Sequence, residues 1–231
     1  MTESEARKLF VDTAKSYLGY SEASGKHRQI IDIYNAKTPL PRNYKVTYTD
    51  AWCATYVSAI AIVCNMANII PRECSCFYQV EQFQKMERWQ ENDGYIPKPG
   101  DIIYYDWQDT GKGDNTGVPD HVGIVEYVSE GSICVIEGNY HDTVDRRYIT
   151  VGARYIRGYG LPNFAWWAAQ QKEEKPVAKD PWYIENGEWA EAQKLGITDG
   201  TNPDKPATRA EVAAMVLRGI NAVLRDLKGE G

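Results

Sequence analysis

The first part of the chain is expected to be helical, because its apolar residues recur at helical spacing. Across Ser4–Tyr20 they return every three or four positions, as they do on the buried face of a helix. The same pattern predicts helices over His27–Asn35 and Tyr78–Gln90. A more apolar helix is predicted over Asp50–Val63, with Asp50 as its N-terminal cap. The sequence therefore begins with a group of helices that bury one or more apolar faces.

The pattern changes after the proline-rich segment Pro97–Asp101, where short apolar runs alternate with turn residues. Such runs are typical of strands, and the glycine-rich, acidic segment Gln108–Asp120 between two of them indicates a long loop. Helices followed by antiparallel strands predict an α+β fold, with the helices packed on one side of a small curved sheet. Strands are predicted over Ile102–Trp107, His121–Val128, Ser132–Glu137 and, once or twice, within Arg147–Tyr159.

The carboxyl-terminal part differs in character from the rest. Residues 169–179 are highly charged and interrupted by Pro176, which is typical of a linker. A short helix over Glu188–Gly196 is then expected, and Thr208 and Glu211 form a capping-box pattern at the start of a second helix. We therefore predict a main domain at 1–168, a linker at 169–179 and a small helical domain at 180–231.

Composition and charge narrow the classes of partner. Hydrophobic residues make up 43% of the 231 positions and charged residues 25%, as in ordinary soluble globular proteins. The net charge of -6 argues against a nucleic-acid partner, which needs a basic surface. We expect no membrane partner, because apolar runs do not approach the ~18 residues of a membrane span. The charged amino terminus lacks the apolar segment of a secretory signal, so synthesis in the cytoplasm is expected.

The five cysteines do not suggest a disulfide scaffold, because their number is odd and the expected compartment is reducing. Cys74 and Cys76 are too closely spaced for a usual zinc site and have no matching second pair. We interpret their spacing as incidental. No metal or cofactor site is predicted.

Cys53 is the candidate nucleophile. It falls in the first turn of the helix expected after Asp50, where free N–H groups and the helix dipole favour an anion. Thiols at such positions can have their pKa lowered from ~8.5 into the range ~3.5 to 7.5. The alternative is packing, since cysteines are among the most frequently buried residues. A nearby base and a group that orients it would favour catalysis.

His121 is the candidate base, because it opens a predicted strand directly after the long loop. His27, in a charged helix, and His141, in a polar turn, are expected at the surface. Glu137 and Asn139 end the next strand, which pairs with the first if a hairpin joins them. Either side chain could then bind the second ring nitrogen of His121 and fix its orientation.

Four ordered motifs resemble the CHAP family of cysteine, histidine-dependent amidohydrolases and peptidases. They are Trp52-Cys53-Ala54-x-Tyr56-Val57, Pro99-Gly100-Asp101-Ile102, His121-Val122-Gly123-Ile124-Val125 and Glu137-Gly138-Asn139, within a resemblance that covers roughly Ala6–Phe164. The resemblance implies a papain-like fold with Cys53 as nucleophile and His121 as general base and acid. It implies that Glu137 orients His121, and gives Asn139 either orientation or transition-state stabilisation. The acidic run by which some members bind calcium is not matched upstream of Cys53.

The same resemblance implies a substrate in peptidoglycan. The bond cut would be either the one between muramic acid and L-alanine or one within the stem or cross-bridge peptide. Aromatic residues near the motifs could line the substrate groove, although aromatic residues also serve in protein cores. The candidates are Trp52, Tyr104, Trp107 and Tyr140.

The tail resembles a single S-layer homology repeat, through Trp189-Ala190, Gly196 to Thr201 and Thr208-Arg209-Ala210-Glu211. The resemblance implies binding to a secondary cell-wall polymer. The candidate contacts are Trp189, Asp199, Gly200 and Arg209, with a core role for Trp189 as the alternative. Anchoring proteins of this kind generally carry three repeats, so a single copy would bind weakly, act through a homo-oligomer or have another role altogether.

Together these features predict a phage or prophage endolysin that is made in the host cytoplasm and reaches the wall when the membrane is breached. Unusual export is the alternative route to the wall. Two alternatives belong to other classes. One is a non-catalytic wall-binding module, which the presence of Cys53, His121 and Glu137 disfavours. The other is a hydrolase or transferase acting on a cytosolic peptide amide, which the S-layer-like tail disfavours.

Overall fold

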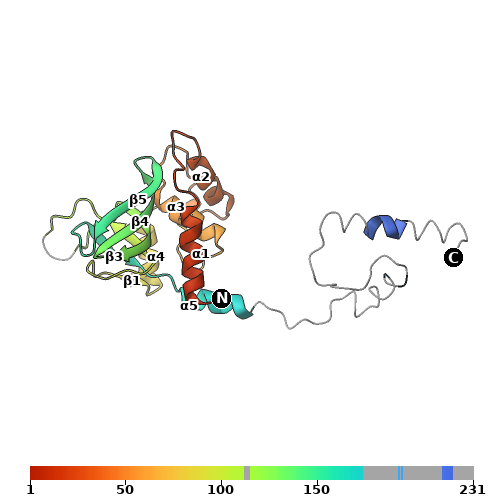
Figure 1. Ribbon diagram of the computed structural model, residues 1–231. Helices are drawn as coiled ribbons and strands as arrows, with labels where there is room; N and C mark the ends of the chain where they lie inside the picture. The colour runs from red at the N-terminus through yellow and green to blue at the C-terminus, as the bar shows by residue number, and fades with distance from the viewer. Residues whose placement is uncertain (112–114, 174–191, 193, 195–214, 221–231) are drawn as a thin grey trace, which may run out of the picture. The chain divides into compact units, whose positions relative to one another are not determined.

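The computed structural model describes residues 1–111, 115–173, 192, 194 and 215–220. The chain divides into two units, Met1–Glu173 and Glu174–Gly231. In the first unit, helices α1, α2 and α3 are grouped beside the antiparallel strands (Figure 1). The α+β prediction, with amino-terminal helices packed on a sheet, is confirmed.

The helices of the first unit follow the predicted pattern with shifted ends. Helix α1 starts with a capping box, in which the Thr2 side chain accepts from the Glu5 N–H and the Glu5 carboxylate accepts from the Thr2 N–H. The segment predicted as a helix up to Gln90 ends earlier, because Glu87 adopts a left-handed backbone with φ of 55°. The helices are α1 Glu3–Lys15, α2 His27–Ala36, the 3-10 helix η1 Pro41–Asn43, α3 Cys53–Val63, α4 Cys76–Lys85 and α5 Phe164–Glu173.

The described strands form one antiparallel sheet in the order β1-β6-β2-β3-β4-β5. A tight turn at Glu130-Gly131 joins β3 to β4, as the sequence predicted, and Ile124 pairs with Ile136 across this hairpin. The next hairpin joins β4 to β5 and pairs Val135 with Arg147. The strands are β1 Trp89–Gln90, β2 Ile102–Tyr105, β3 His121–Ser129, β4 Ser132–Tyr140, β5 Thr143–Thr150 and β6 Ile156–Gly160.

Both faces of the sheet are covered by apolar side chains. Along β2, Ile102 and Tyr104 join the core under the helices, whereas Ile103 and Tyr105 join a second cluster on the opposite face. This division follows from the alternation of side chains along a strand. Strand β2 is therefore buried on both sides, between β6 and β3.

Helix α3 is the centre of this unit. Residues Cys53 to Ala61 are all buried, and the helix contacts α1, α2, β3 and β4. Gly138 lets β4 lie directly against it, because a Cβ atom there would come within 2.4 Å of the Tyr56 Cβ. A helix that is apolar on every side fits only such an enclosed place. Its amino-terminal residue is thereby held firmly against the sheet.

The predicted carboxyl-terminal boundaries are only partly covered by the structure. Residues 169–173, which were assigned to a linker, belong to helix α5, which packs against α1. In the second unit, residues 215–220 are helical, within the helix predicted after Thr208. Trp189, Asp199, Gly200 and Arg209 lie outside the described residues. Within the described part of the chain, no helix is long and apolar enough to cross a membrane.

Candidate active site

Cys53 is the first residue of α3, as the sequence predicted, but Asp50 is not the cap. Trp52 takes the cap position, and the Asp50 carboxylate instead accepts hydrogen bonds from the Thr47 N–H and the Tyr44 hydroxyl, at 2.7 and 2.9 Å. The reason is spacing, because Asp50 lies two residues before the cap position. No side chain among the described residues caps this helix, so its first N–H groups remain available for an anion.

Cys53 is 7% exposed, and its sulfur lies 3.7 Å from the sulfur of Cys76, the first residue of α4. The hydrogen bond with Cys76 lowers the pKa of Cys53 most strongly, and the hydrogen bond and charge of His121 lower it further. Burial opposes these effects, yet the pKa of Cys53 ends well below its ordinary value. The geometry thus favours a thiolate at neutral pH.

His121 lies between the thiol and a buried carboxylate. Its Nε2 is 2.9 Å from Glu137 Oε2, which leaves Nδ1 as the ring nitrogen available to Cys53. Burial by itself would lower the pKa of His121, but its hydrogen bonds with Cys53 and Glu137 and their charges raise it to about 9. The lowered pKa of Cys53 and the raised pKa of His121 therefore favour a thiolate–imidazolium pair, the resting state of a cysteine nucleophile with its base.

Glu137 is the residue that orients His121. Its side chain is fully buried and reaches His121 from β4 across the position of Gly123 on β3. A Cβ atom at Gly123 would lie 2.7 Å from the Glu137 Cγ and 2.4 Å from a methyl carbon of Val135. Gly123 therefore leaves the space in which the carboxylate sits.

Asn139, the other candidate for this role, has a left-handed backbone with φ of 57° and is half-buried. The structure records no hydrogen bond from Asn139 to His121 among the described residues. The sequence left open whether Glu137 or Asn139 orients His121, and in the structure Glu137 is the one that contacts it. A role for Asn139 in stabilising the transition state stays a prediction.

Arg147 continues the series of hydrogen-bonded side chains, and the sequence did not predict its role. Its Nε donates to both carboxylate oxygens of Glu137, at 2.8 and 2.9 Å. Because Arg147 pairs with Val135, it is a diagonal neighbour of Glu137 on the same face of the sheet. Only the register of the β4–β5 hairpin reveals this position, since the sequence indicated a strand in this region without its partner. His121, Glu137 and Arg147 thus connect three adjacent strands.

The four aromatic residues proposed for the substrate groove have different environments. Trp52 and Tyr104 are fully buried, so the prediction that they contact the substrate is wrong. Trp52 donates from Nε1 to Glu22 at 3.0 Å, and the Tyr104 hydroxyl donates to Gln79 at 3.0 Å. Their aromatic rings are core residues because the helices and the sheet enclose them.

Trp107 and Tyr140 lie beside Arg147 and are partly exposed. The Arg147 guanidinium carbon is 4.0 Å from the centre of the Tyr140 ring and 5.0 Å from that of Trp107. Trp107 is 37% exposed and also stacks on Tyr105, with ring centres 4.9 Å apart. These two residues hold the arginine by cation–π contacts, and their role in binding substrate stays a prediction.

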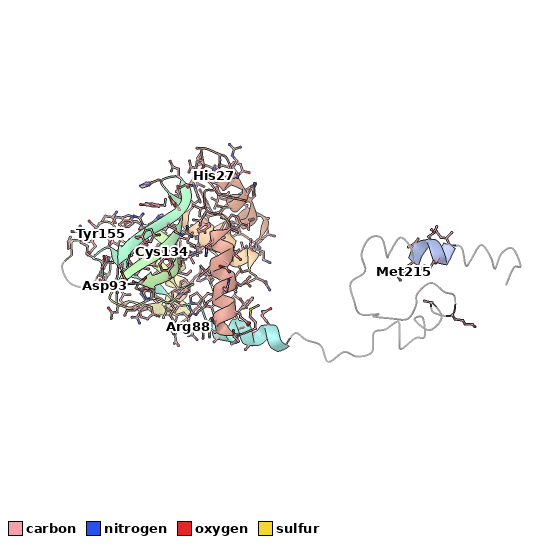
Figure 2. The ribbon with its side chains drawn as sticks, viewed as in Figure 1. His27, Arg88, Asp93, Cys134, Tyr155 and Met215 are labelled. Carbon is pink, nitrogen blue, oxygen red and sulfur yellow. The ribbon has the colours of Figure 1, made fainter. Side chains whose placement is uncertain are left out.

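Neither of the other two histidines has a recorded hydrogen bond with Cys53, His121 or Glu137 among the described residues, and His141 stacks on Tyr140 with ring centres 4.2 Å apart. His141 is exposed in a turn, as predicted. His27 was expected at the surface but is only 4% exposed, and it lies among the helices in Figure 2. It is buried because its ring packs 5.9 Å from that of Trp52 and its Nε2 lies 3.0 Å from the Tyr48 carbonyl.

Within the described ranges, no group of three or more His, Cys, Asp or Glu side chains is placed to hold a metal ion. In the long loop, the Asp120 carboxylate accepts from the Trp107 N–H at 2.7 Å and from the Gln108 amide at 3.1 Å. These contacts tie the loop to the residue before His121.

Comparison with protein families matches residues 43–139 to the CHAP domain. This segment contains Cys53, His121, Glu137 and Asn139, and ends before Arg147. The CHAP domain is a cysteine, histidine-dependent amidohydrolase or peptidase domain, in agreement with the paired thiol and imidazole. A comparison with curated proteins gave no match.

Two solved structures are similar to the chain at 14% sequence identity and a TM-score of 0.39. One is described as the crystal structure of Ly7917, and the match covers 70% of this chain and 63% of that one. The other is described as Ly7917 with the hydrolyzing product of MDP, with 68% and 62% covered. The match therefore spans less than two thirds of these relatives.

Proposed function

We propose that the protein is a peptidoglycan hydrolase that cleaves an amide bond with Cys53 as the nucleophile. The observation that carries the proposal is the continuous arrangement of Cys53, His121 and Glu137 within a CHAP domain. The pairing of a depressed thiol pKa with a raised imidazole pKa is what nucleophilic amide cleavage requires. The cell wall as target is supported by the sequence resemblance of both the domain and the tail.

In this mechanism the Cys53 thiolate attacks the carbonyl carbon of the amide. The first N–H groups of α3 receive the negative charge that develops on the carbonyl oxygen. The His121 imidazolium then protonates the departing amine as the C–N bond breaks, which leaves a thioester on Cys53. His121, now neutral, takes a proton from water, and the resulting attack releases the acid and restores the thiolate. Glu137 keeps the imidazole aimed throughout.

The test is lysis of purified walls from several Gram-positive bacteria. The wild-type protein should lower the turbidity of the suspension and release new amino groups, and Cys53→Ala should do neither. Cys74→Ser is the matched control, because Cys74 is another cysteine but does not contact His121 in the described structure. If Cys53→Ala lyses walls as well as the wild type, or no wall is cleaved, the proposal fails.

Two finer points depend on further measurements. The enzyme would be either an N-acetylmuramoyl-L-alanine amidase or a peptidoglycan endopeptidase. Mass spectrometry of the released fragments separates the two. An amidase frees the lactyl carboxylate of muramic acid and the amino group of L-alanine, whereas an endopeptidase frees a carboxylate and an amino group within the peptide. A new amino group on L-alanine would support the amidase.

We further propose that the protein acts as a phage or prophage endolysin, reaching the wall after membrane breach, with the tail as a wall-binding repeat. Its sequence resemblance to an S-layer homology repeat supports this role. The full chain carrying Cys53→Ala should sediment with walls, and adding Arg209→Ala should weaken sedimentation. Walls stripped of secondary polymer should no longer distinguish the two proteins. Equal sedimentation on intact walls would contradict the assignment of Arg209.

A further inference from the structure

The two sulfur atoms at the active site belong to the starts of two different helices. Cys53 begins α3 and Cys76 begins α4, each is 7% exposed, and their sulfurs are 3.7 Å apart. The sequence had suggested that the Cys74 and Cys76 spacing is incidental. Folding places only one of these two cysteines against the nucleophile, so for Cys76 that interpretation is wrong.

A buried amide holds the two helices in this arrangement. The Gln79 side chain, one turn into α4, donates from Nε2 to the Ala54 carbonyl in the first turn of α3, at 3.4 Å, and to the Pro71 carbonyl, at 3.2 Å. Its Oε1 accepts from the Tyr104 hydroxyl. Because Gln79 and Tyr104 are fully buried, α4 cannot shift far from α3 without breaking several hydrogen bonds. The approach of the sulfurs is therefore built into the fold.

The two thiols differ in charge. The hydrogen bond with Cys53 raises the pKa of Cys76 most, and burial and the negative charge of Cys53 raise it further. Cys76 thus stays protonated and donates its S–H to the Cys53 thiolate. An oxidant therefore meets one reactive sulfur, Cys53, with a protonated thiol beside it.

We propose that Cys53 and Cys76 form a reversible disulfide when a hydroperoxide enters the active site. In the first step the Cys53 thiolate attacks one oxygen of hydrogen peroxide. The O–O bond breaks, Cys53 becomes a sulfenic acid, and hydroxide leaves and is protonated to water. In the second step the Cys76 sulfur attacks the Cys53 sulfur, the S–O bond breaks, and the Cys76 proton leaves with the oxygen as a second water. Two thiols are oxidised and one peroxide is reduced.

The first step prepares the second. Once Cys53 carries an oxygen instead of a negative charge, the charge that held the proton on Cys76 is gone, and Cys76 becomes a better nucleophile. The sulfurs then need to approach from 3.7 Å to the disulfide length of about 2.05 Å. Cys74 is not placed for this reaction, because its sulfur accepts a hydrogen bond from Arg42 at 3.4 Å and the residue is more exposed than Cys76.

The consequence is that oxidation stops the enzyme without destroying it. The disulfide removes the nucleophile from use and prevents further oxidation to the sulfinic acid, which thiols do not reverse. The loss of activity rests on the proposed function, whereas the disulfide itself does not. A mass measurement therefore tests the bond even if the substrate has been wrongly assigned.

The experiment treats the full-length reduced protein with hydrogen peroxide, blocks free thiols, and digests it for mass spectrometry. A peptide joining Cys53 to Cys76 is expected in the wild type. Wall lysis should fall at least about tenfold and return to within about twofold of the untreated sample after dithiothreitol. Cys76→Ser, measured against its own untreated activity, should lose lysis without recovery and should accumulate sulfinic acid at Cys53. Cys74→Ser should behave as the wild type.

Two results would contradict the disulfide. Sulfinic acid at Cys53 of the wild type with no joined peptide would overturn the proposal, as would full recovery of Cys76→Ser. If Cys76→Ser does not fold, the disulfide is tested by the joined peptide in the wild type and by the recovery of wall lysis in Cys74→Ser. If the joined peptide forms but no sample ever cleaves walls, the disulfide stands and the proposed substrate fails.

Discussion

The active site has a sheet side and a helix side, and they contribute different things to the same histidine. On the sheet side, His121, Glu137 and Arg147 come from three neighbouring strands and are joined by hydrogen bonds of 2.8 to 2.9 Å. On the helix side, Cys53 and Cys76 begin two helices and share one proton. The sheet side orients His121, and the helix side supplies the hydrogen bond that lowers the pKa of Cys53 most strongly. Reactivity at Cys53 therefore depends on both sides, although their residues lie on separate elements.

The largest effect is expected from removing the residue where the two sides meet. His121→Ala should lower kcat/KM for wall cleavage by about 10³-fold or more, because the thiolate loses its partner and the leaving amine its proton donor. Initial rates of turbidity loss measure this. His141→Ala is the control, since His141 is an exposed histidine in a turn. Equal losses in the two variants would contradict the assignment of His121.

A smaller loss of activity is expected when the space that Gly123 leaves for the Glu137 side chain is filled. Gly123→Ala puts a methyl group where the Glu137 side chain lies, so either the carboxylate or β4 must move. Overpacking of this kind costs about 1–3 kcal/mol of stability. We expect a lower melting temperature and roughly a 10²-fold loss of kcat, since the base is no longer aimed. An unchanged kcat in a protein of lowered melting temperature would show that Glu137 tolerates displacement.

Arg147 should act through Glu137 and have a still smaller effect. Arg147→Met removes the cation that holds both carboxylate oxygens, and kcat should fall about tenfold with little change in KM. The uncompensated Glu137 charge should raise the pKa of His121 further, so the alkaline limb of the kcat/KM profile should move to higher pH. Arg147→Lys should restore part of the rate. A change in KM alone, with no shift in the limb, would instead indicate that Arg147 binds substrate.

The smallest predicted effect concerns the helix side and appears in the pH dependence. Activity needs the Cys53 thiolate and the His121 imidazolium, so the alkaline limb of kcat/KM should fall near pH 9, as His121 loses its proton. The acid limb reports the lowered pKa of Cys53. Cys76→Ala should move the acid limb to higher pH and reduce activity a few-fold below neutrality, because the thiolate loses its strongest hydrogen bond. An unmoved acid limb would contradict this role of Cys76.

The linked stability change has a definite sign. Because the pKa of His121 is raised on folding to about 9, its contribution to stability is full below its unfolded pKa of about 6.5. That contribution is lost as the pH rises through about 9. The wild-type melting temperature should therefore fall over this interval more than that of His121→Ala, as differential scanning fluorimetry would show.

The sequence determined the features whose signals are local. The spacing of apolar residues predicted the helices, and the turn at Glu130-Gly131 predicted the β3–β4 hairpin. Short motifs predicted that Cys53 begins a helix and that His121 and Glu137 lie on two paired strands. These signals are reliable because hydrogen bonds within a helix or across a tight hairpin join residues close in the chain.

Only the tertiary structure decided which neighbours these residues have. The register of the strands places Arg147 in the site, and the packing of α4 on α3 places Cys76 there. Trp52 and Tyr104 cannot contact substrate, because other elements enclose them. Their local sequence is the same whether they face solvent, a substrate or the core. Burial and pairing between distant segments depend on the whole fold, and these decide which thiol and which arginine lie near the nucleophile.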